Sequence, residues 1–241
     1  MFRLTLLGSL GIEAADGSSP DRATQPRQLA LLALLAASEA PLTRDKLVGY
    51  LWPEEGDSRA RRRLSDTLYV LRRELGSEAI VAQGDTLALN PTVIDSDLAG
   101  FEAGLDAGDL EKAASLYGGD FLDGFHLSGT VAFERWVDRR RQRFAERYRV
   151  ALETLASSAA ERGELRAAVH WRRRRVAEEP YSSLAVRRLV EALVEMGDRP
   201  AALQAARAHE QRIRSDLDAS PDAEFVELVK ELRESDVEVG S

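Results

Sequence analysis

Residues 57–76 read Asp-Ser-Arg-Ala-Arg-Arg-Arg-Leu-Ser-Asp-Thr-Leu-Tyr-Val-Leu-Arg-Arg-Glu-Leu-Gly, and their spacing predicts one amphipathic helix. Leucines recur along it at intervals of four, three and four residues, which places them on one stripe at 3.6 residues per turn: Leu64, Leu68, Leu71 and Leu75. The residues expected roughly opposite that stripe are Arg59, Arg62, Asp66, Tyr69 and Arg73. Six arginines lie between positions 59 and 73, where Asp66 is the only acidic residue. Such a face is suited to an anion, and DNA is the expected one.

The segments around this helix predict a winged helix-turn-helix over residues 1–96. Residues 2–7 and 10–14 alternate around Gly8-Ser9 like a small pair of strands, and residues 16–21 form a loop. A first helix is expected from Pro26 to Ser38, and a second over residues 44–51, capped by Thr43 and ended by Trp52-Pro53. After the arginine helix, residues 79–82 and 86–89 form a hairpin around Gln83-Gly84-Asp85. Three helices followed by a hairpin wing are the parts of this fold.

From residue 97 the pattern changes to consecutive helices without strand signals. Gly163 and Gly197 lie 34 residues apart, as do Ala168 and Ala202, a period typical of tetratricopeptide-type helical hairpins. Residues 118–125 predict an inserted turn, and a long helix is expected at roughly 131–162. The predicted fold class is therefore mainly α, with a winged helix at 1–96, a tetratricopeptide-like all-α domain at 97–236 and a flexible tail at 237–241.

Composition excludes several classes of function. The chain has 241 residues, a formal net charge of −8 and no cysteine, so disulfides and thiolate chemistry are excluded. The isolated histidines His126, His170 and His209 show no metal-ligand spacing, and no phosphate-binding loop or nucleophile elbow occurs. We therefore expect no enzyme, no cofactor and no metal. The N-terminus does not resemble a signal peptide and no apolar run is long enough to span a membrane, so we expect a cytoplasmic protein.

The order of several motifs resembles the SARP-type bacterial transcriptional regulators, over nearly the whole chain. The similar segments are Leu42-Thr43-Arg44-Asp45-Lys46-Leu47, Leu51-Trp52-Pro53, residues 64–76, Gly119-Asp120-Phe121-Leu122-Asp123-Gly124-Phe125, Phe133-Glu134-Arg135-Trp136, Glu179-Pro180-Tyr181 and residues 217–221. The resemblance implies an OmpR-like winged helix before a bacterial transcriptional activator domain (BTAD). It further implies direct-repeat promoter sites, side-by-side protomers forming a homodimer on DNA, and contact with RNA polymerase. The sequence departs from the family at Thr67 and Tyr69, where Tyr and Ser are usual, and its wing lacks a basic residue.

On this reading the arginine helix docks in the major groove. Arginine forms two hydrogen bonds with guanine and also binds phosphate, so Arg59, Arg62 and Arg63 are assigned to bases or phosphates. Tyr69 and Arg73 are assigned to the DNA backbone. Asp66 either accepts a hydrogen bond from cytosine or orients Arg62 one turn away. Arg44 and Lys46 open the preceding helix, where they bind phosphate or are ordinary surface charges.

The functional hypothesis is a sequence-specific DNA-binding transcriptional regulator, expected to act as an activator that recruits RNA polymerase. The alternative is a tetratricopeptide-type adaptor that binds proteins and not specific DNA, which suits the acidic net charge. A second basic run, Arg172-Arg173-Arg174-Arg175, has acidic residues at helical spacing and predicts a solvated, ion-paired face.

Overall fold

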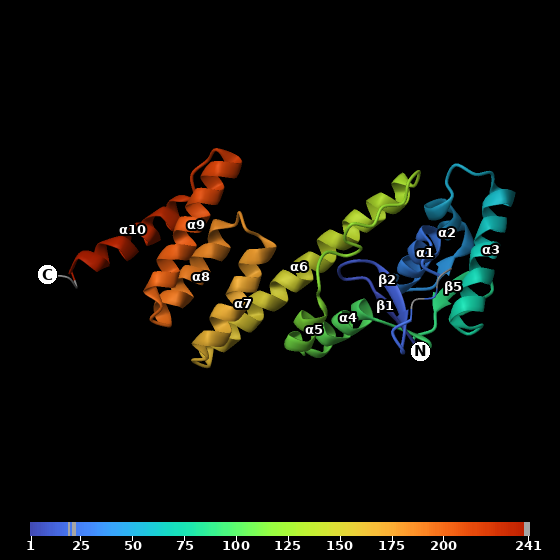
Figure 1. The fold of residues 1–241 in the computed structure, drawn as a ribbon, viewed down its shortest axis with the longest axis horizontal. Coiled ribbons are helices and arrows are strands. Elements are labelled where there is room, and N and C mark those ends of the chain that lie inside the picture. The colour runs from blue at the N-terminus through green and yellow to red at the C-terminus, as the bar shows by residue number, and fades with distance from the viewer. Residues whose placement is uncertain (19, 21–22, 239–241) are drawn as a thin grey trace. The chain divides into compact units, whose positions relative to one another are not determined.

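The computed structural model describes residues 1–18, 20 and 23–238, and the chain divides into two compact units (Figure 1). Unit 1 comprises Met1–Tyr148 and unit 2 comprises Arg149–Ser241. The expected loop at 16–21 and the expected tail at 237–241 lie partly outside the described residues. The part of that tail that is described, residues 237 and 238, is the end of a helix.

The first and last strands of the winged-helix region of unit 1 belong to one three-stranded sheet with the order β2-β1-β6. β1 (Phe2–Thr5) pairs antiparallel with β2 (Gly11–Ala14), which confirms the predicted pair of strands. β6 (Ile94–Ser96) pairs parallel with the other edge of β1, so that Phe2 faces Ile94. The sequence analysis did not predict β6, because three residues are too few to show an alternating pattern.

The first two helices follow the predicted bounds closely. α1 (Pro26–Ala36) begins with its proline, and all residues from Gln28 to Leu35 are buried, as expected for a helix inside the core. β3 (Leu42–Thr43) leads into α2 (Arg44–Leu51). The Thr43 hydroxyl accepts a hydrogen bond from the Lys46 amide at 3.3 Å, which caps the helix as predicted.

The arginine helix is α3 (Asp57–Leu75), and its leucine stripe lies in the core of unit 1. All four stripe leucines are at most 3% exposed. β4 (Ile80–Gln83) and β5 (Thr86–Leu89) form the predicted hairpin, and β3 joins them in a sheet of order β3-β5-β4. The helices α1, α2 and α3 with this hairpin make up the predicted winged helix-turn-helix (Figure 1).

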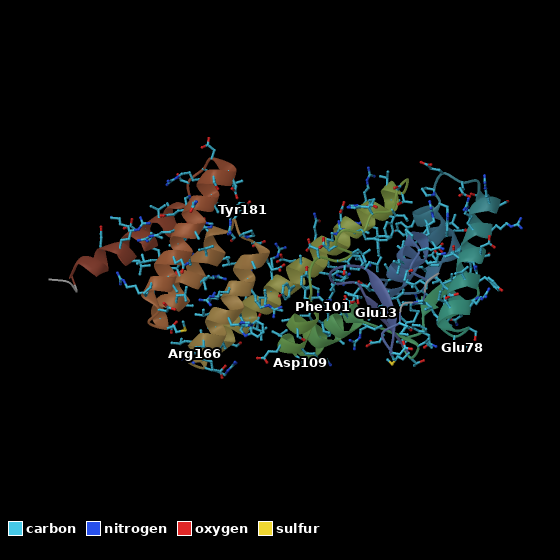
Figure 2. The ribbon with its side chains drawn as sticks, viewed as in Figure 1. Glu13, Glu78, Phe101, Asp109, Arg166 and Tyr181 are labelled. Atoms are coloured by element: carbon cyan, nitrogen blue, oxygen red, sulfur yellow. The ribbon has the colours of Figure 1, made fainter. Side chains whose placement is uncertain are left out.

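Unit 1 continues with a helical hairpin and a turn that returns to β1. α4 (Asp97–Ala107) and α5 (Leu110–Leu116) pack together, with Phe101 of α4 fully buried (Figure 2). The turn at 118–125 then pairs with the chain around Gly8, where the Leu122 amide donates to the Leu6 carbonyl at 2.8 Å. Arg141 of α6 (Val131–Glu161) donates to the carbonyls of Phe121 and Leu122 at 2.8 and 2.7 Å. These bonds fix the turn against the N-terminal strand.

Unit 2 contains the end of α6 and four further described helices: α7 (Leu165–Glu178), α8 (Ser183–Glu195), α9 (Arg199–Leu217) and α10 (Ala223–Glu238). α7, α8 and α9 lie side by side in sequence order (Figure 1). Leu189 and Leu193 of α8 share one core cluster with Phe225 of α10. Gly163 and Gly197, which define the 34-residue period, both have positive φ, at 73° and 84°. Glycine adopts this conformation without steric cost, so both act as helix terminators. The helical hairpins predicted from the period are confirmed.

The boundary predicted between residues 96 and 97 is the junction of β6 and α4. Both of these elements belong to unit 1, and the division between the compact units falls within α6. Asp97 is the first residue of α4 and ties the junction to β1, since its carboxylate accepts hydrogen bonds from the Leu6 and Leu7 amides at 2.8 and 2.9 Å. Burial raises the pKa of Asp97.

Candidate nucleic-acid interface

One face of α3 is fully polar and exposed. Opposite the buried leucines lie the residues expected there, Arg59, Arg62, Asp66, Tyr69 and Arg73, and all five are exposed. Tyr69 is 68% exposed, although a large aromatic side chain usually buries more of its surface. Arg63 lies at the edge of this face, with 51% of its side chain exposed. The structure therefore brings the predicted residues of α3 together on one accessible surface.

The arginines of α3 differ in whether a neighbour neutralises them. Arg59 and Arg63 share the carboxylate of Glu55, with nitrogen–oxygen distances of 3.6 and 2.8 Å. Arg61 pairs with Asp45 of α2 at 2.7 Å, and Arg72 donates to the Ile80 carbonyl at 3.0 Å. Within the described residues, Arg62 and Arg73 have no hydrogen-bonded or ionic partner. These two guanidinium groups are available to an external anion.

Asp66 lies on the exposed face one turn from Arg62, but no ion pair joins them among the residues that the structure describes. The sequence analysis considered two roles for Asp66. The structure shows no contact that would let Asp66 orient Arg62. The carboxylate remains open to solvent and can accept a hydrogen bond from outside the chain.

The N-terminus of α2 adds two more cations. Arg44 and Lys46 form no ion pair within the described part of the chain, and both belong to the first turn of the helix. The Arg44 amide donates to the Asp85 carbonyl at 3.0 Å, which ties the start of α2 to the tip of the wing. Cations at this end oppose the helix dipole, so neither side chain gains stabilisation from its own helix.

The wing itself carries no basic residue at its tip, as the sequence indicates. Its turn consists of Gln83, Gly84 and Asp85, and the Thr86 hydroxyl donates to the Gln83 carbonyl at 2.9 Å. Asp85 adds negative charge where a phosphate-binding wing would place a cation. Most cations of the described winged-helix region therefore lie on α2 and α3, and none lies on the wing.

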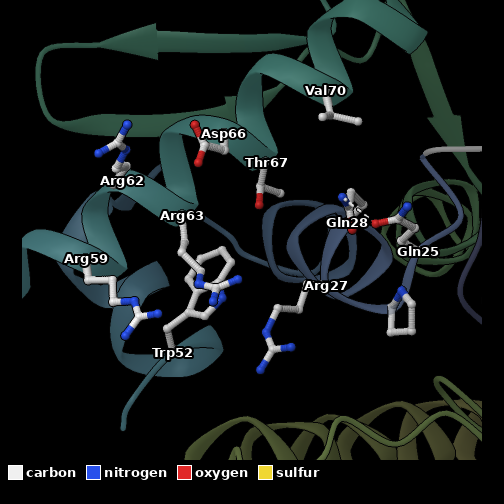
Figure 3. A pocket seen from close by; sticks show the side chains of 11 residues that line it. Gln25, Arg27, Gln28, Trp52, Arg59, Arg62, Arg63, Asp66, Thr67 and Val70 are labelled. Carbon is white, nitrogen blue, oxygen red and sulfur yellow. Dashed lines mark hydrogen bonds between the residues drawn. The ribbon is translucent and has the colours of Figure 1, made fainter. Parts of the chain in front are cut away.

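A groove of about 490 Å³ runs beside α3, between this helix and the start of α1 (Figure 3). Arg59, Arg62 and Arg63 line it from α3, and Arg27 lines it from α1. Its floor contains the buried side chains of Gln28, Trp52 and Thr67. Four guanidinium groups therefore line one hollow of the winged-helix region.

The described residues offer no site for a metal ion. No group of three or more His, Asp or Glu side chains in this part of the chain could coordinate a metal ion. His209 is buried against Phe225 and hydrogen-bonded to the Ser183 hydroxyl at 2.9 Å, and burial lowers its pKa. It is therefore a structural residue. None of the described helices is long and apolar enough to cross a membrane.

The second basic run lies in α7 and is ion-paired, as predicted. Arg172 contacts Glu153 at 3.3 Å, and Arg175 contacts Glu179 at 2.6 Å. Arg174 packs against the Trp171 ring at 5.4 Å. Two of the four arginines are thus ion-paired and a third packs on a ring, so we do not take the run as a second candidate interface.

Two features of the interface were absent from the sequence analysis. Glu55 and Asp45 neutralise arginines of α3, and Arg27 extends the groove from another helix. The four-residue spacing of Glu55 and Arg59 is a signal that could have revealed the first pair. The other contacts join residues whose proximity only the fold determines.

By fold, the chain is a winged-helix protein with an attached region of helical hairpins. A family model described as Bacterial transcriptional activator domain matches residues 101–233, more than half of the 241 residues. The chain belongs to this family, which confirms the resemblance found in the sequence. It is a family of transcriptional regulators and not of enzymes, and it implies DNA as a partner.

A solved structure supports the fold over nearly the whole chain. The structure of Mycobacterium tuberculosis EmbR in complex with a low affinity phosphopeptide matches with a TM-score of 0.63 and 22% sequence identity. The match covers 97% of this chain and 65% of that one, so the chain spans less than two thirds of the EmbR chain. No curated protein matches the sequence.

Proposed function

We propose that the chain is a sequence-specific regulator that docks α3 in the major groove of promoter DNA. The observation that carries this proposal is the exposed face of α3, where Arg62 and Arg73 have no partner within the described residues. A paired arginine must give up its ion pair before it binds DNA, whereas Arg62 and Arg73 can bind bases or phosphates directly. Arg62 is assigned to a base edge and Arg73 to a phosphate, with Tyr69 beside them.

Arg44 and Lys46 of α2 are assigned to phosphates that flank the major groove. Asp66 is assigned to a base amino group, because its carboxylate is exposed between Arg62 and Tyr69. Arg59 and Arg63 contribute to DNA binding once their shared Glu55 carboxylate is displaced.

The helical hairpins of the BTAD region are assigned to protein contacts, with RNA polymerase as the partner that activation requires. Such a regulator acts where the bacterial chromosome lies, in the cytoplasm.

The test is the salt and sequence dependence of DNA binding by the purified full chain. A genome-wide binding footprint supplies the promoter duplex, and fluorescence anisotropy measures its affinity between 50 and 200 mM salt, a range set by counterion release. With roughly 4–6 phosphate contacts per protomer, the log–log slope is expected to be about −4 to −5. An adaptor without specific DNA binding shows no such slope and no preference for the promoter duplex.

Arg62→Ala tests the assignment at residue level. We expect it to weaken specific binding by about 1–3 kcal/mol, roughly 5- to 150-fold, because a base contact is lost. Arg166→Ala is the matched control, since Arg166 is an exposed arginine of unit 2 (Figure 2) and its loss leaves α3 intact. Promoter affinity that survives replacement of Arg59, Arg62 and Arg63 together would contradict the assignment of α3.

A further inference from the structure

We propose that Glu55 limits the affinity of α3 for non-specific DNA by withholding Arg59 and Arg63 from phosphate. This inference rests on the proposed function, because it concerns how the same helix discriminates between DNA sequences. Glu55 would thus be a positioning residue that acts through two arginines and sets the ratio of specific to non-specific binding.

The geometry places one carboxylate between two guanidinium groups. The Nε atom of Arg63 lies 2.8 Å from one Glu55 oxygen and 3.1 Å from the other. The Nε atom of Arg59 lies 3.6 Å from Glu55 Oε2. The Glu55 side chain is only 23% exposed, whereas that of Arg59 is 76% exposed. The carboxylate is thus set into the surface beneath the two arginines.

Backbone hydrogen bonds fix the loop that carries Glu55. The Glu55 amide donates to the Trp52 carbonyl at 3.2 Å, and Trp52 itself is only 3% exposed. On the other side, the Arg59 amide donates to the Gly56 carbonyl at 2.9 Å, which starts α3. The loop that carries Glu55 is therefore short and hydrogen-bonded on both sides of this residue, next to the first turn of α3.

The arginines of α3 therefore divide into two kinds. Arg62 lies between Arg59 and Arg63 in sequence, lines the same groove (Figure 3) and has no partner in the described part of the chain. Arg59 and Arg63 contribute one net positive charge with Glu55 instead of two. Because non-specific affinity follows the number of phosphates that are neutralised, this pairing removes affinity that carries no sequence information.

Glu55→Gln tests the proposal, because glutamine keeps the shape of glutamate and removes its charge. On mixed-sequence duplex at about 0.1 M salt, we expect affinity to rise about 3- to 10-fold, since one added phosphate contact contributes roughly 8-fold there. The log–log salt slope should become steeper by about 1–2. Affinity for the promoter duplex should rise less, so the ratio of specific to non-specific binding should fall.

Glu54→Gln is the matched control. Glu54 precedes Glu55 in the same loop, is exposed and forms no ion pair within the described residues, yet its replacement changes the net charge equally. We expect Glu54→Gln to leave the salt slope unchanged. Glu55→Asp, which retains the negative charge, should stay closer to the wild-type slope than Glu55→Gln does. Thermal unfolding of each variant shows whether the fold is intact.

Two results would overturn the proposal. Equal salt slopes for Glu54→Gln and Glu55→Gln would mean that Arg59 and Arg63 do not reach phosphate. Weaker non-specific binding by folded Glu55→Gln would mean that the carboxylate presents the arginines to DNA. Failure of the proposed function is distinguishable, because the wild-type chain would then show no promoter preference and no loss on Arg62→Ala.

Discussion

At Gly118 the chain passes so close to the N-terminal strand that a side chain has no room. A Cβ atom at this position would lie 2.9 Å from the Leu7 carbonyl oxygen, a backbone atom that cannot move away easily. We therefore expect Gly118→Ala to lower the free energy of unfolding by about 1–3 kcal/mol, as overpacking does elsewhere. Urea unfolding followed by circular dichroism measures this change.

Gly49→Ala is the control at the same scale and should act in the opposite direction. Gly49 lies inside α2, and nothing stands within 4 Å of a Cβ atom added there. Alanine in a helix interior is favoured over glycine by about 0.5–1 kcal/mol, so stability should rise. If both substitutions had the same effect, the close approach at Gly118 would not be the cause.

At the scale of elements, Glu179 joins two helices of unit 2. Glu179 is the C-cap residue that follows α7. Its carboxylate pairs with Arg175 of α7 at 2.6 Å and also with Arg149 of α6. The hydrogen bond from Arg175 is the main reason why the pKa of Glu179 lies below its ordinary value of 4.5, and Arg149 adds to the effect. Glu179→Gln should lower the free energy of unfolding at pH 7 by about 0.5–1 kcal/mol, since solvent partly screens the pair.

The sign of the pH dependence follows from the lowered pKa. The stabilisation by Glu179 is present in full above the pKa of the unfolded chain, near 4.5, and is lost as pH falls through the lower folded value. The difference between wild type and Glu179→Gln should therefore shrink between pH 5 and pH 3, which urea unfolding at several pH values can follow. Glu164→Gln, which disrupts the exposed pair with Arg162, should have a smaller effect at every pH. A difference that grows towards low pH would contradict this account.

Most helices could be predicted from the periodic spacing of their apolar residues. Short strands and contacts between residues distant in sequence could not be predicted. The leucine stripe, the proline at the start of α1 and the glycines of the helical hairpins each act locally, so they defined α1, α3 and the repeats. β6 escaped prediction because its partner β1 lies about 90 residues earlier and Ile94 is its only apolar residue. The exposed face of α3 followed from spacing alone. The pairing of its arginines did not, because it depends on where the loop before α3 and the helix α2 lie.

At the scale of the whole molecule, the net charge of −8 opposes association with DNA. On α2 and α3, the described cations without a hydrogen-bonded or ionic side-chain partner are Arg44, Lys46, Arg62 and Arg73, which are few for tight binding by one protomer. We therefore expect weak binding to one half-site and cooperative binding of two protomers to direct repeats spaced by a helical turn of about 10–11 base pairs.

The spacing of the half-sites tests this prediction. Inserting about 5 base pairs places the second site on the opposite face of the duplex and should abolish cooperativity. An insertion of a full turn, about 10 base pairs, serves as the control and should retain more of the cooperativity. Anisotropy titrations, with stoichiometry from analytical ultracentrifugation, measure both. Equal binding to all three spacings would show that protomers bind independently.

The pairing of β1 with β6 also bears on synthesis of the chain. β1 is translated before both of its neighbours, and β2 follows it within a few residues. The other edge of β1 stays unpaired until residues 94–96 have been translated. Leu6 and Leu7 likewise lack their hydrogen-bond partners until Asp97 and the turn at 118–125 have been translated. At about 5–20 residues per second, translation needs roughly 6–25 s to proceed from β1 to that turn. During that interval β1 presents an open edge, so slow translation between β1 and residue 123 prolongs its exposure to aggregation.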